Sequence, residues 1–151
     1  MVTRSALVSL AIQYLGAKSV RYSGASKGMV PSGFDCSGFV SFICKRLGIA
    51  IPRHCNQIFD HGGILIHSTA RSRGDLVFFS RDGMRPTHVG ILVDIDEYIH
   101  SPGTDEGVVC LSQLQFHQKI RPRAGQIYFR NPIGFKRLGI REGRWLRPLE
   151  Q

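Results

Sequence analysis

The chain has 151 residues, of which 42% are hydrophobic and 21% charged, and its formal net charge is +9. This length and composition fit one globular domain with its own core, and they exclude a chain that is disordered throughout. No apolar run approaches the ~18 residues that a membrane-spanning helix needs.

The first half of the chain is expected to form helices and loops. Apolar residues at helical spacing predict a helix over residues 4–15. A polar loop rich in Gly and Ser follows over residues 18–33. A second helix is expected to begin near Cys36 and to end at Gly48, and a short third helix is expected over residues 55–59.

The second half is expected to form short strands. Segments rich in β-branched and aromatic residues, separated by turn residues, occupy residues 75–79, 89–93, 97–100 and 126–130. Helices followed by closely spaced strands indicate an α+β domain with an antiparallel sheet. We expect one domain, with its main unit over residues 1–130 and a basic C-terminal extension of the same domain over residues 131–151.

The positive charge is concentrated at the C-terminal end. Residues 119–151 contain nine Lys or Arg against two Glu, a balance of +7. Such a segment suits a polyanionic partner, and a solvated basic tail is the alternative. No nucleic-acid-binding motif is present, so we predict no nucleic-acid partner.

Cys36 lies at the predicted start of the second helix. Unpaired N–H groups and the helix dipole stabilise negative charge there, which is expected to lower the thiol pKa and favour the nucleophilic thiolate. The same N–H groups can bind an oxyanion, and the preceding Asp35 suits a helix N-cap. A lone cysteine on a helix is more often a small core residue, so Cys36 is a candidate nucleophile only if other catalytic residues accompany it.

Two histidines supply such partners. His88 enters an apolar strand and is followed by Gly90, which would let another chain approach closely. If the strands expected over residues 89–93 and 97–100 form a hairpin, His100 lies beside His88 and can fix the tautomer of the His88 ring. A metal site built from Cys36, His54 and Cys55 has no recognised ligand spacing, so we predict no metal and no cofactor.

Four segments together resemble the NlpC/p60 family of papain-like cysteine peptidases of bacterial peptidoglycan. They are residues 35–40 (DCSGFV), 73–79 (RGDLVFF), 88–91 (HVGI) and 98–101 (YIHS). The Cys-to-His and His-to-His spacings also agree with the family, and the resemblance covers roughly residues 5–130. It implies a papain-like α+β fold, with the nucleophile at a helix N-terminus packed on an antiparallel sheet.

The resemblance also implies an activity and three catalytic residues. Cys36 would attack the carbonyl, His88 would activate Cys36 and protonate the leaving amine, and His100 would orient His88. The substrate would be a peptidoglycan stem peptide, cut at the bond between γ-D-glutamate and the diamino acid. Residues 1–130 would then form the catalytic unit.

Substrate-binding residues are implied by position as well. Asp35 and Ser37 match positions that contact the free amino end of the substrate, and Arg53 matches a basic position beside the cleft. Family members carry a tyrosine near the oxyanion, and either Tyr22 or Val20 occupies its place here.

Other functions fit the same pattern less well. An amidase or another acyl-transfer enzyme on this fold is the main alternative, and an antibacterial effector is a further hypothesis. A non-enzymatic module that binds anionic wall polymer through the basic end is disfavoured by the intact Cys and His set. The substrate places the site of action at the cell wall, periplasmic or extracellular. No signal peptide is visible and the export route is open, and the sequence identifies no inhibitor or immunity partner.

Overall fold

The computed structural model describes residues 3–21, 29–30, 33–104, 107–114, 132–141 and 144–145. Within these residues the helices are α1 (Arg4–Ile12), α2 (Cys36–Arg46), α3 (Cys55–His61) and the short 3-10 helix η1 (Ser68–Ala70). The main sheet contains β3 (Ile64–Ile66), β4 (Leu76–Phe79), β5 (His88–Leu92), β6 (Glu97–His100), β7 (Cys110–Gln113) and β8 (Pro132–Arg137). Two small pairs complete the fold, β1 (Met29–Val30) with β2 (Gly33–Phe34), and β9 (Ile140–Arg141) with β10 (Arg144–Trp145).

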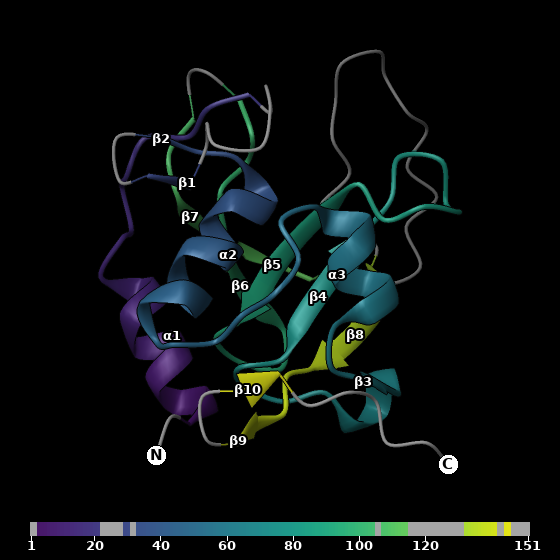
Figure 1. Ribbon diagram of the computed structural model, residues 1–151. Helices are drawn as coiled ribbons and strands as arrows, with labels where there is room; N and C mark the ends of the chain where they lie inside the picture. Colours follow the sequence, from purple (N-terminus) through teal and green to yellow (C-terminus); the bar gives the residue numbers. More distant parts are fainter. Residues whose placement is uncertain are drawn as a thin grey trace.

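The six strands run antiparallel in the order β3-β8-β4-β5-β6-β7, and the helices gather on one face of the sheet (Figure 1). Alternate residues of β4 explain this layering, since Leu76 and Phe78 join the helices in the main core. Val77 and Phe79 belong to a second, smaller cluster with Tyr98. The predicted α+β fold with an antiparallel sheet is confirmed.

Helix α2 forms where the sequence predicts it, and its two ends have clear causes. The Asp35 side chain accepts a hydrogen bond from the Gly38 N–H at 2.7 Å and so caps the N-terminus. At the other end Gly48 has φ +75°, a left-handed conformation that glycine adopts at little cost. The Ile49 N–H then bonds back to the Cys44 carbonyl at 2.8 Å, which closes the helix.

Several elements differ from the prediction. Helix α1 ends at Ile12, three residues early, and the next residues form turns that lead to Gly16 at φ +86°. Helix α3 continues to His61 rather than ending at residue 59. The strand predicted over residues 126–130 lies outside the described residues. Strands β3, β7 and β8 were not predicted.

Strand β8 shows how the C-terminal basic segment is used. It lies in the middle of the sheet, between β3 and β4, and two of its basic residues point to protein groups rather than to solvent. Lys136 is buried with its Nζ 5.6 Å from the centroid of the Phe59 ring, and Arg137 pairs with Asp75. The division at residue 130 stays a prediction.

The four cysteines are free thiols. In the part of the chain that the structure describes, no helix has the length and apolarity that crossing a membrane requires.

The buried carboxylate of Asp75 joins three distant parts of the fold. Its Oδ1 lies 3.2 Å from Arg4 Nη1 in α1 and 2.9 Å from Arg137 Nε in β8. Its Oδ2 accepts from the Ser72 N–H at 2.8 Å and from Arg137 Nη2 at 3.0 Å. Because the side chain has 0% exposure, these bonds supply the partners that a charge removed from water requires.

We expect Asp75→Ala to lower the free energy of unfolding by about 3 kcal/mol, since a buried ion pair loses one partner. The matched control is Asp96→Ala, because Asp96 also pairs with an arginine, Arg71, but its side chain is 64% exposed. Its loss should cost below about 1 kcal/mol. Urea unfolding followed by circular dichroism measures both, and equal losses would contradict the role given to Asp75.

Candidate active site

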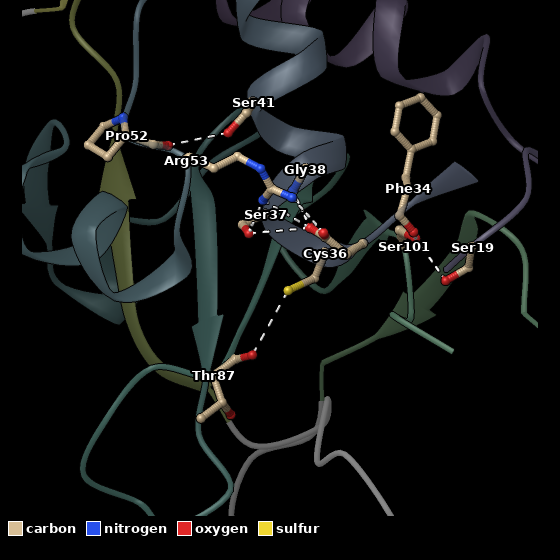
Figure 2. A network of polar contacts seen from close by, with 11 residues as sticks. Ser19, Phe34, Cys36, Ser37, Gly38, Ser41, Pro52, Arg53, Thr87 and Ser101 are labelled. Carbon is tan, nitrogen blue, oxygen red and sulfur yellow. Dashed lines mark hydrogen bonds and ion pairs between the residues drawn. The ribbon is translucent and has the colours of Figure 1, made fainter. Parts of the chain in front are cut away.

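Cys36 is the first residue of α2, and it is half-buried at the point where β5 begins. Its Sγ lies 3.9 Å from the carbonyl oxygen of Thr87, the residue immediately before β5 (Figure 2). The first turn of α2 therefore lies beside Thr87, the residue that leads into β5 and His88. The fold brings together two motifs that are 52 positions apart in the sequence.

The thiol of Cys36 is surrounded by protein although the residue as a whole reaches the surface. Its pKa is raised to about 11, mainly because burial disfavours the thiolate and also because Asp35 lies beside it. Hydrogen bonds from the backbone of Val89 and Ser37, and the charge of Arg53, act in the opposite direction. The sequence prediction of a lowered pKa is therefore wrong, because burial and Asp35 outweigh the helix terminus.

His88 and His100 form a buried pair, each with 1% exposure. Nε2 of His88 lies 2.7 Å from Nδ1 of His100, and the two rings meet nearly at right angles. The pKa of His88 is held well below its usual value by burial, then by His100 and by Arg81. Burial lowers the pKa of His100 to about 3. Both imidazoles are thus neutral near pH 7.

The hairpin of β5 and β6 holds this pair in place. The His88 ring packs against Phe79, and the His100 ring packs 4.7 Å from the centroid of Tyr98. Gly90 lets the strands approach this closely, since a Cβ there would lie 2.8 Å from Tyr98 Cδ2 and 3.3 Å from His100 Cβ. The predicted close approach at this glycine, and the predicted contact between the two histidines, are confirmed.

Ser37 and Arg53 lie beside Cys36 (Figure 2), and they form one network with Asp35. Arg53 binds both carboxylate oxygens of Asp35, at 3.1 Å and 2.6 Å, and its Nη1 also donates to Ser37 Oγ at 2.9 Å. Asp35 is 1% exposed and Ser37 is 3% exposed. Three of the four predicted substrate-binding residues are therefore together, but the Asp35 carboxylate is already bound by a guanidinium and a helix N–H.

A second network next to the site was not assigned from the sequence. The buried Ser101 donates to the Phe34 carbonyl at 2.6 Å, and its Oγ lies 3.0 Å from Ser19 Oγ (Figure 2). Ser19 Oγ also accepts from the N–H groups of Gly103 and Thr104. This network ties the end of β6, which carries His100, to the residue before Asp35. The position of Ser101 directly after His100 was the available signal.

One predicted substrate residue is not described. Tyr22 lies outside the described residues. Val20 packs against Gly33, since a Cβ added to Gly33 would lie 2.5 Å from Val20 Cγ1. The assignment of the family tyrosine position to one or the other stays a prediction. Across the described residues no group of three or more His, Cys, Asp or Glu is arranged to hold a metal ion.

Comparison with known proteins agrees with this geometry. The model of the NlpC/P60 family matches residues 18–123. The chain is 36% identical over 78 residues to a γ-D-glutamyl-L-lysine dipeptidyl-peptidase of Bacillus cereus, which covers 50% of this chain and 23% of that protein. It is 36% identical over 100 residues to the murein DD-endopeptidase MepH of Escherichia coli, which covers 64% of this chain and 35% of that protein.

A solved structure gives the same result. The crystal structure of an NlpC/P60 family protein from Bacillus cereus superposes with a TM-score of 0.72 and 28% sequence identity, covering 90% of this chain and 40% of that one. The chain thus spans well under half the length of each of these relatives. Because the family model matches more than two thirds of the chain and includes Cys36, His88 and His100, the protein belongs to the NlpC/P60 family.

Proposed function

We propose that the protein is a cysteine endopeptidase that hydrolyses peptidoglycan stem peptides. The observation that carries the proposal is the 2.7 Å contact between His88 and His100, formed next to the helix start that holds Cys36. A nucleophile, a base within a buried site and a group that orients the base are the parts that acyl transfer requires. The names of the relatives support the same class of reaction.

The proposed reaction starts from a neutral thiol and a neutral imidazole. His88 takes the proton of Cys36 as the sulfur attacks the substrate carbonyl, and Nδ1 receives it because Nε2 faces His100. The imidazolium that forms donates through Nε2 to His100, which orients and stabilises it. The N–H of Cys36, at the start of α2, is placed to bind the oxyanion.

Two further steps complete the cycle. The tetrahedral intermediate collapses to a thioester on Cys36, and His88 gives its proton to the leaving amine. Water then attacks the thioester while His88 accepts a proton from it. Breakdown of the second intermediate releases the new carboxylic acid and returns the proton to the thiol of Cys36.

The bond that we propose is cut joins γ-D-glutamate to the diamino acid, as the name of the Bacillus cereus relative suggests for that protein. Ser37 and Asp35 are proposed to receive the free amino end of the substrate. A substrate amine that pairs with Asp35 would share the carboxylate with Arg53, which binds both of its oxygens. We propose that the protein acts at the cell wall.

Cleavage products test the proposal directly. We expect the wild type, incubated with muropeptides, to release a peptide that begins with the diamino acid and to leave L-Ala-γ-D-Glu behind. Cys36→Ala should release none, because the proposed nucleophile is removed, and mass spectrometry identifies the products. The two proteins should have the same circular dichroism spectrum, which excludes loss of folding as the cause.

Other products would change the assignment. Separation of the sugar from an intact peptide would identify an amidase instead. Cleavage by Cys36→Ala at the wild-type rate would contradict Cys36 as the nucleophile. No cleavage of any wall type by the wild type would contradict the peptidase proposal.

The pH dependence of kcat/KM provides a second prediction. His88 accepts a proton only when neutral, and its lowered pKa keeps it neutral below pH 6.5. The activity should therefore persist on acidification through pH 6.5 and fall at lower pH. The rate at which iodoacetamide alkylates Cys36 should increase with pH up to the pKa of the thiol, about 11.

Arg81→Ala sharpens this measurement, because Arg81 contributes to the lowered pKa of His88. Its removal should raise the pKa of His88 and so move the acidic limb of the kcat/KM–pH profile to higher pH. Arg85→Ala is the matched control, since Arg85 is exposed in the same loop, and its limb should stay at the wild-type pH. An acidic limb above pH 6.5 in the wild type would contradict the neutral pair.

A further inference from the structure

His100 has a second contact that the proposed reaction does not use. Its Nε2 lies 2.9 Å from Ser112 Oγ and 3.6 Å from Cys110 Sγ. Both residues belong to β7, where Cys110 is the register partner of His100 and Ser112 the partner of Tyr98. The edge strand of the sheet thus continues the line of polar groups that begins at His88.

Proton counting gives this line a direction. If Nδ1 of His88 is to receive the thiol proton, the hydrogen of neutral His88 is on Nε2, which donates to Nδ1 of His100. His100 must then carry its own hydrogen on Nε2. That N–H points to β7 and needs an acceptor there, because a buried donor without one is costly.

Ser112 suits this acceptor role better than Cys110. Its oxygen is 0.7 Å closer to Nε2, and a hydroxyl oxygen is a stronger acceptor than a thiol sulfur. A hydroxyl also accepts and donates at once. A hydrogen bond from Ser112 is one of the two influences on the pKa of the Cys110 thiol, which it lowers while burial raises it more. Ser112 can therefore accept from the ring while its own hydrogen is directed to the sulfur.

We propose that Ser112 is a positioning residue of the active site, which holds His100 in the tautomer that accepts from His88. This inference rests on the proposed function, since the transfer of the thiol proton to Nδ1 of His88 sets the tautomer, but the tautomer can be measured without activity. With Ser112 absent, the two tautomers of His100 become closer in free energy. In the wrong tautomer His100 presents an N–H to His88, and His88 can face it only by moving its own hydrogen to Nδ1. His88 is then unable to accept the thiol proton.

The neutral state of His100 makes the tautomer decisive. Since burial lowers its pKa to about 3, it carries one ring hydrogen over the whole working range of pH. A carboxylate in this position would accept in any orientation, whereas a neutral imidazole accepts only through the nitrogen without hydrogen. A third group that selects this nitrogen is therefore required, and Ser112 is in hydrogen-bond contact with the other one.

Kinetics of three variants test the effect on rate. Ser112→Ala should lower kcat by about 3- to 10-fold, the effect of one lost hydrogen bond, with KM unchanged because no substrate contact is removed. Ser112→Thr keeps the hydroxyl and should restore kcat to within about twofold of the wild type. Gln113→Ala, an exposed neighbour on the same strand, is the matched control and should match the wild type. A wild-type kcat in Ser112→Ala, or a loss in KM alone, would overturn the proposal.

The ring nitrogens can be observed without activity. In Cys36→Ala labelled with ¹⁵N-histidine, NMR shifts should show the hydrogen of His100 on Nε2, and adding Ser112→Ala should populate the Nδ1–H form. Adding Cys110→Ala instead should leave the tautomer unchanged. A tautomer that follows Cys110 rather than Ser112 would overturn the proposal. If the wild type is inactive but His100 is in the Nε2–H tautomer, the inference about Ser112 is supported and only the proposed reaction is contradicted.

Discussion

The buried carboxylate of Asp35 sets the constraint on which the position of Cys36 depends. With 1% of its surface exposed, this charge has to find partners inside the protein. The Gly38 N–H and the guanidinium of Arg53 supply them. The first of these bonds decides where α2 begins, and the second ties the chain before α3 to the same point. Cys36 is consequently the first residue of a helix whose start has little freedom to shift.

The same Asp35 carboxylate disfavours the thiolate form of Cys36. Its charge and the surrounding protein both raise the pKa of Cys36, so the proposed nucleophile is a neutral thiol near pH 7. The histidine pair matches this state, since burial keeps both rings neutral as well. No charge has to be separated in a desolvated site until substrate is present. In the proposed reaction the thiolate–imidazolium charges develop only as the carbon–sulfur bond forms, where the start of the helix is placed to stabilise the oxyanion.

Local signals explain which features the sequence predicts. Asp35 and Gly48 mark the ends of α2 by side-chain chemistry alone, and the apolar runs of β4, β5 and β6 stand between clear turns. The four segments 35–40, 73–79, 88–91 and 98–101, with their order and spacing, were sufficient to identify the family. Strand β8 has no such signal, because Pro132, Gly134 and two basic residues hide its pattern, and only its neighbours β3 and β4 make it a strand. The predicted lowering of the Cys36 pKa was wrong for the same reason. Desolvation raises this pKa, and desolvation depends on how the whole domain packs.

The strand order has a consequence for how the domain assembles as it is made. Strands β4, β5, β6 and β7 pair with their neighbours in the chain, so this part can form early through short loop closures. Strand β3 precedes all of them, yet its partner is β8, and β8 also supplies the second neighbour of β4. The hairpin that carries both histidines is therefore complete while one edge of β4 is still open. Until residues 132–137 leave the ribosome, that apolar edge is available to other chains, which makes it the point where a nascent molecule most needs protection from aggregation.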